Sequence, residues 1–178
     1  MTDDETKDET RDGAAETSGA AASEDARGVE RRELCVLRAG RRTFAVHAEE
    51  VEAIGEDLRP APLPFAPHTV LGVVALRGRA RTLIDPSALA DDAPAPRAAD
   101  DDAEGFAVVA LRGDEQLALA ASTVEPSVEV AARDIAPADA SEPFALGVVR
   151  FGEVAATLLD PSKLFEAAMR GTERRRKR

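Results

Sequence analysis

The sequence predicts a mainly β protein built from two similar halves, and three observations carry this prediction. Short runs rich in Val, Leu and Ala alternate with Gly-containing turns, which is typical of the strands of small β-barrels. One pattern occurs twice, with its copies 75 positions apart. Acidic segments lie before and between the copies, and Val29 is their only large aliphatic residue after Met1, so residues 31–169 form the expected folded region.

The strands are expected in pairs, because apolar runs flank short turns that contain glycine. The predicted hairpins are 34–37 with 43–46 around Gly40, 73–76 with 80–84 around Gly78, and 106–111 with 116–120 around Gly113. The Pro-rich segment 60–67 cannot take part in a regular strand ladder, because proline lacks a backbone N–H. We therefore expect an extended, rigid connector there.

The repeated pattern aligns 71–89 with 146–164, and 11 of the 19 aligned residues are identical. Each copy ends in Asp-Pro-Ser after a predicted strand. Asp85 and Asp160 can accept a backbone N–H as helix N-caps, and the proline that follows suits the first helical position. The second of these helices is expected to run through Met169. Two copies are too few for a solenoid and suit a pseudo-symmetric pair of subdomains.

The remaining segments are predicted from their composition. Residues 1–30 are rich in Asp, Glu, Thr, Ser, Gly and Ala and should be a disordered acidic tail. Residues 91–104 form a Pro-containing acidic loop that divides the folded region into halves of about 31–90 and 105–169. Residues 170–178 form a basic C-terminal tail.

Composition limits the function classes. The net charge of −11 argues against general nucleic-acid binding, because an acidic surface repels phosphate. No apolar run approaches the roughly 20 residues that span a bilayer, and the single Cys35 cannot form an intramolecular disulfide, so a cytoplasmic protein without direct membrane insertion is expected. Only three residues are lysines, at positions 7, 163 and 177, which fits either a halophile or an Arg- and Ala-biased GC-rich genome.

One stretch resembles a known family. Pro62-Leu63-Pro64-Phe65-Ala66-Pro67, then Leu71-Gly72-Val73-Val74-Ala75-Leu76-Arg77-Gly78 and Thr82-Leu83-Ile84-Asp85, is similar without a gap to the signature of CheW-like chemotaxis adaptors. The resemblance extends over about 31–169. It implies two interlocked five-stranded SH3-like β-barrel subdomains with short helices. It also implies a non-catalytic scaffold, without a cofactor, that couples methyl-accepting chemotaxis receptors to the histidine kinase CheA at membrane arrays.

The resemblance further implies three partner-binding residues. Val51 falls in the kinase-facing region, and Gly72 and Arg77 match positions implicated in receptor and kinase coupling. From the residues alone, Val51 could be a core residue, Gly72 a conformational glycine and Arg77 a solvated turn residue. Departures from the family pattern include Ala53, Ala75, Thr82 and Pro86-Ser87. A CheW-like scaffold recruited to a different signalling array would show such departures as well.

Other function classes have weak support in the sequence. His47, His68 and Cys35 have no neighbouring His or Cys at metal-ligand spacing, and no nucleophile, base and orienting group can be assembled from them, so neither a metal site nor a catalytic residue is expected. A nucleic-acid-binding small barrel could use the basic residues 174–178. Such barrels combine basic grooves with stacking aromatic residues, whereas this chain has six Phe and no Tyr or Trp.

Overall fold

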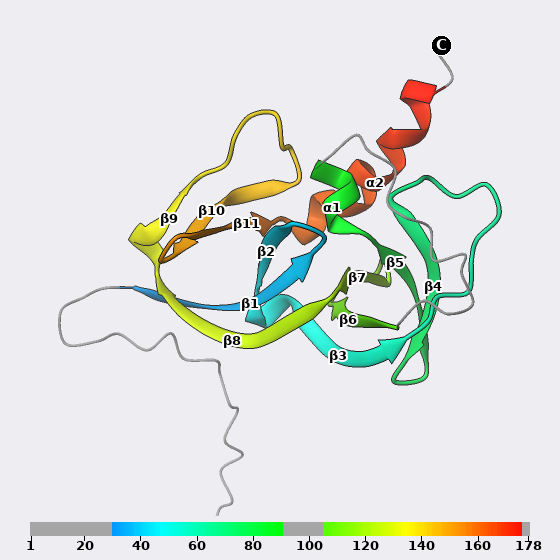
Figure 1. Ribbon diagram of the computed structural model, residues 1–178, viewed down its shortest axis with the longest axis horizontal. Helices are drawn as coiled ribbons and strands as arrows, with labels where there is room; N and C mark the ends of the chain where they lie inside the picture. The colour runs from blue at the N-terminus through cyan, green and yellow to red at the C-terminus, as the bar shows by residue number, and fades with distance from the viewer. Residues whose placement is uncertain (1–29, 91–104, 176–178) are drawn as a thin grey trace, which may run out of the picture.

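The computed structural model describes residues 30–90 and 105–175 (Figure 1). Apart from Glu30, the predicted acidic tail 1–30 and the acidic loop 91–104 lie outside the described residues, as do residues 176–178. The described chain is mainly β, with two curled sheets that lie side by side and two α-helices, which confirms the predicted fold class.

Eleven strands form the two sheets of the described chain. We call the six-stranded sheet, with the order β8-β1-β2-β11-β10-β9, sheet A, and the five-stranded sheet, with the order β3-β6-β7-β5-β4, sheet B. The strands are β1 (Arg31–Ala39), β2 (Arg42–His47), β3 (Val51–Leu58), β4 (Val70–Leu76), β5 (Arg79–Ile84), β6 (Phe106–Leu111), β7 (Leu117–Ala121), β8 (Thr123–Ala131), β9 (Ile135–Pro137), β10 (Ala145–Phe151) and β11 (Val154–Leu159). The helices are α1 (Pro86–Ala90) and α2 (Pro161–Arg175), with 3-10 turns η1 (Ala48–Glu50) and η2 (Ala132–Asp134).

The sequence repeat is also a structural repeat. Strands β4 and β5 and helix α1 each begin 75 positions before β10, β11 and α2. The two sets also occupy equivalent places, since the order β6-β7-β5-β4 in sheet B corresponds to β1-β2-β11-β10 in sheet A. The predicted pseudo-symmetry is therefore present in the strand order of both sheets.

The two sheets do not coincide with the two sequence halves. The β1–β2 hairpin of the first half lies in sheet A beside β11 of the second half, through a parallel pairing of Phe44 with Thr157. The β6–β7 hairpin of the second half lies in sheet B beside β5 of the first half, through a parallel pairing of Leu83 with Ala118. Each sheet thus takes strands from both halves, and the halves are interlocked.

A shared core joins the two sheets. Phe44 from sheet A, Leu111 from sheet B and Leu164 from α2 belong to one cluster of buried side chains and are each at most 1% exposed. A smaller cluster lies within each sheet, around Val149 in sheet A and around Val108 in sheet B. The interior of the protein is therefore continuous across the boundary between the two sheets.

Both predicted helix caps are present. The backbone N–H of Ser87 donates to Oδ1 of Asp85 at 2.8 Å, and that of Ser162 donates to Oδ1 of Asp160 at 3.1 Å. Burial would raise the pKa of Asp160, but hydrogen bonds from Ser162 and Lys163 and the positive charge of Lys163 hold it below its ordinary value. The proline after each Asp begins the helix, as the sequence predicts.

Candidate partner-binding site

Arg77 lies at the tip of the β4–β5 hairpin. Arg77 and Gly78 form the two-residue turn, with positive φ angles of 51° and 75°, and Leu76 pairs with Arg79 on either side. The Arg77 side chain is exposed and has no hydrogen bond or ion pair within the described part of the chain. Its planar guanidinium, with five N–H donors, is therefore available to a carboxylate or carbonyl of another molecule.

Val51 begins β3, directly after the 3-10 turn η1. It pairs with Leu111 of β6, and its half-buried side chain packs against the shared core. On its other side, the N–H of Arg112 donates to the carbonyl of Glu50 at 2.8 Å, which ties η1 to the end of β6. Val51 therefore contributes to packing and also leaves part of its side chain accessible at the surface.

Gly72 is buried and has a φ of 148°. A Cβ atom there would lie 2.2 Å from the carbonyl oxygen of Ala61, which belongs to the connector between β3 and β4. Ala61 and Val73 exchange both of their backbone hydrogen bonds at 2.8 Å, so this connector is held directly against β4. The absence of a side chain at Gly72 permits the contact, and the buried residue presents no side chain to a partner.

The structure brings Val51 and Arg77 toward the same end of sheet B. Glu52, next to Val51, forms ion pairs with Arg79 and Arg81 of β5, at 3.5 Å to Arg79 Nη1 and 2.6 Å to Arg81 Nη2. Arg79 is two residues from Arg77, so these ion pairs join the start of β3 to the base of the β4–β5 hairpin. Gly72 lies five residues before Arg77, roughly 16 Å along the strand, and is not part of this group.

Sequence reasoning missed the buried Arg81. Its side chain is 1% exposed, and its Nη1 donates to the carbonyl of Leu111 at 3.0 Å while its Nε has no partner within the described residues. The aligned residue of the second copy is Ala156, so the repeat contains no signal for a buried charge. An arginine can be buried there because the fold brings Glu52 of β3 close to β5. The sequence does not show that these two strands are neighbours in space.

The described residues offer little for chemistry of other kinds. No three His, Cys, Asp or Glu side chains gather into a metal site within 30–90 and 105–175. Cys35 is buried in β1, and burial raises the pKa of its thiol to about 11, so it is protonated at neutral pH. Among the helices described, none is both long and apolar enough to cross a membrane.

Comparison with known proteins bears directly on this arrangement. A family model described as the CheW-like domain matches residues 33–169. The chain belongs to the CheW-like family. Its fold is also similar to the scaffolding protein TtCheW from Thermoanaerobacter tengcongensis, with a TM-score of 0.59 and 17% identity over 76% of this chain and 92% of that chain. A comparison with curated protein sequences finds no match.

The residues that depart from the CheW-like pattern differ in how far they are buried. Ala75 is exposed on β4, two residues before Arg77, whereas Ala53 is buried in β3. Pro86 is buried at the start of α1, and the Ser87 hydroxyl donates to Asp85 at 2.6 Å. Of these substitutions, the one at Ala75 changes the surface beside the hairpin tip.

Proposed function

We propose that this chain is a chemotaxis adaptor that couples methyl-accepting chemoreceptors to the histidine kinase CheA. It acts without catalysis, as a cytoplasmic scaffold at membrane receptor arrays. Membership of the CheW-like family and the likeness to a solved scaffolding protein support this proposal. The acid-rich, lysine-poor composition suits a cytoplasm with high salt.

The observation that carries the proposal is Arg77, which is exposed on a hairpin held against β3 and has no partner among residues 30–90 and 105–175. The turn projects the guanidinium, and the ion pairs of Glu52 with Arg79 and Arg81 fix the base of the hairpin against β3. A hairpin that is already held in place loses less backbone entropy when it is ordered in an interface. Val51 is the second proposed contact, because it lies beside Glu52 on the same end of sheet B.

Arg77→Ala tests this function. If Arg77 is an anchor, binding to fragments of CheA and of a receptor should weaken by more than tenfold, about 2 kcal/mol, because a charged donor is lost from an interface. The melting temperature should hardly change, since Arg77 has no partner within the described part of the chain. Isothermal titration with each fragment measures affinity, and circular dichroism measures melting.

Arg150→Ala is the matched control, because Arg150 is also exposed but lies on β10 of sheet A. Arg112 is a poorer control, since its backbone bond to Glu50 places it next to Val51. Equal affinities for wild type and both variants would remove Arg77 from the interface. Wild-type protein that binds neither fragment would contradict the proposed function as a whole.

A second candidate is a CheW-like scaffold that serves a different signalling array. It is favoured by Ala75, which is exposed beside the hairpin where the family carries an asparagine. Such a scaffold would bind another kinase or receptor class through the same end of sheet B. Failure to bind CheA fragments, together with retention of a different sensor kinase through Arg77, would favour this candidate.

A further inference from the structure

The β4–β5 hairpin carries three arginines within five residues, at positions 77, 79 and 81. Residues 75–81 contain no carboxylate, although the chain has 34 Asp and Glu residues against 23 Lys and Arg. Arg77 and Arg79 are exposed, whereas Arg81 is buried. The tip of this hairpin is therefore a small basic surface on an acidic protein, and such a surface attracts groups of the opposite charge.

The hairpin fold itself does not require these arginines. Its counterpart in the second half is the hairpin of β10 and β11, and the aligned residues there are Gly152, Val154 and Ala156. Arg77 has a φ of 51°, and Gly152 has a φ of 60° at the aligned position. Because a side chain is strained at such an angle and glycine is not, Arg77 costs the fold stability that a glycine would not. Strained residues of this kind are concentrated at functional sites.

Glu52 forms ion pairs with two of the three arginines. Its Oε2 lies 2.6 Å from Nη2 of Arg81, and its Oε1 lies 3.5 Å from Nη1 of Arg79. The buried Arg81 needs this carboxylate, because an uncompensated charge in the interior is very costly. Arg79 is 60% exposed, and an exposed pair at the longer distance contributes little. Glu52 therefore neutralises Arg81 and leaves the positive charge of Arg79 largely uncompensated.

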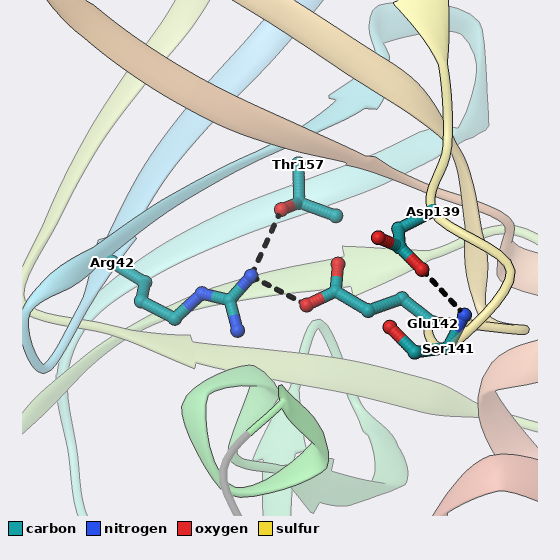
Figure 2. A network of polar contacts seen from close by, with 5 residues as sticks. All are labelled: Arg42, Asp139, Ser141, Glu142 and Thr157. Carbon is teal, nitrogen blue, oxygen red and sulfur yellow. Dashed lines mark hydrogen bonds and ion pairs between the residues drawn. The ribbon is translucent and has the colours of Figure 1, made fainter.

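An arginine at the same place in another hairpin has close partners instead. Arg42 begins β2 directly after the turn of the β1–β2 hairpin, as Arg79 begins β5 directly after the turn of the β4–β5 hairpin. Figure 2 shows that Arg42 Nη2 lies 2.6 Å from Glu142 Oε1 and 3.3 Å from Thr157 Oγ1. The Arg42 side chain is only 30% exposed as a result. The fold can thus satisfy an arginine at this position, and it does not do so for Arg79.

We propose that Arg77 and Arg79 together bind an acidic segment of the protein partner, with a carboxylate for each guanidinium. This inference rests on the proposed function, and it adds Arg79 and the chemistry of the partner segment. Charge complementarity supports it, because two guanidinium groups two residues apart lack a full complement of negative charge within the described part of the chain. Each guanidinium can donate two parallel hydrogen bonds to one carboxylate.

A charge series at Arg79 tests the inference in the full chain, with the CheA or receptor fragment that loses affinity in Arg77→Ala. Arg79→Gln should weaken binding by at least about threefold, and Arg79→Glu by at least about tenfold, because like charges then face each other. Arg79→Lys should lie between wild type and Arg79→Gln, since it keeps the charge and loses the planar fork. The effect of Arg79→Gln should shrink as NaCl is raised, because salt screens exposed charges.

Melting temperatures separate binding from folding in these variants. Arg79→Gln should melt close to wild type, because it loses only the long ion pair to Glu52. Arg77→Gly should lose as much affinity as Arg77→Ala and yet melt above it, since glycine suits the positive φ.

The matched control is Arg133→Gln. Arg133 is 75% exposed and also forms a long ion pair, at 3.9 Å to Asp134, but it lies in η2 between two strands of sheet A, so affinity should not change. Full affinity of Arg79→Gln and Arg79→Glu, beside a loss in Arg77→Ala, would overturn the inference and leave the adaptor function intact. A salt-independent effect of Arg79→Gln would overturn the role of charge.

Two further outcomes reach beyond Arg79. Wild-type protein that binds neither fragment, or Arg77→Ala without effect on either, would overturn the inference together with the proposed contact of Arg77. Binding of a single-stranded oligonucleotide that Arg77→Ala and Arg79→Gln abolish, in place of binding to the protein fragments, would assign this surface to a nucleic acid and overturn the inference.

Discussion

Arg81 places a guanidinium inside sheet B, with Glu52 as its charged partner at 2.6 Å. Glu52→Gln would leave that buried charge without compensation, which is far more costly than losing an exposed pair. We expect the melting temperature to fall by more than about 5 °C. Arg79→Gln should have a smaller effect, because Arg79 is 60% exposed and lies 3.5 Å from the same carboxylate.

The same pair gives a pH dependence. The hydrogen bond from Arg81, supported by its charge, lowers the pKa of Glu52 below the ordinary value of 4.5. A carboxylate with a lowered pKa stabilises the fold fully above that ordinary value, and the contribution is lost as the pH falls through the lowered pKa. The melting difference between wild type and Glu52→Gln should therefore be largest near neutral pH and shrink below about pH 4.5. A difference independent of pH would contradict this.

Helix α2 stabilises the protein through one face. Leu164 and Ala168 are buried in the shared core at 0% and 1% exposure, whereas Phe165 and Met169 are 45% and 46% exposed. Leu164→Ala should cost about 2–5 kcal/mol of unfolding free energy, because it leaves a cavity where both sheets meet. Phe165→Ala should cost clearly less. Urea denaturation of the two variants makes the comparison, and similar small losses would mean that α2 is not part of the core.

The interlocked halves predict how the whole molecule folds. Because each sheet takes strands from both halves, neither 1–97 nor 98–178 contains a complete sheet. We expect each fragment alone to lack a cooperative thermal transition, and an equimolar mixture to regain one together with β-sheet circular dichroism. A cooperative transition in either isolated fragment would show that a half can fold without its partner strands.

The sequence by itself determined the elements and their repetition. The identical residues of 71–89 and 146–164 predicted two equivalent strand pairs, and Asp85 and Asp160 predicted the caps that the structure contains. The Leu-Arg-Gly turn predicted an arginine at a hairpin tip, and Arg77 lies there. These features are local, because turn conformation and capping depend on residues only a few positions apart.

Only the tertiary structure decided how the halves combine and which side chains face inward. Strands β2 and β11 pair across more than 100 residues, so no local pattern specifies that neighbour. Arg81 is buried because Glu52 of β3 and the Leu111 carbonyl of β6 lie within reach of its guanidinium, although the aligned residue of the second copy is Ala156. Burial depends on what surrounds a residue in three dimensions, and that is set by contacts between segments far apart in the chain.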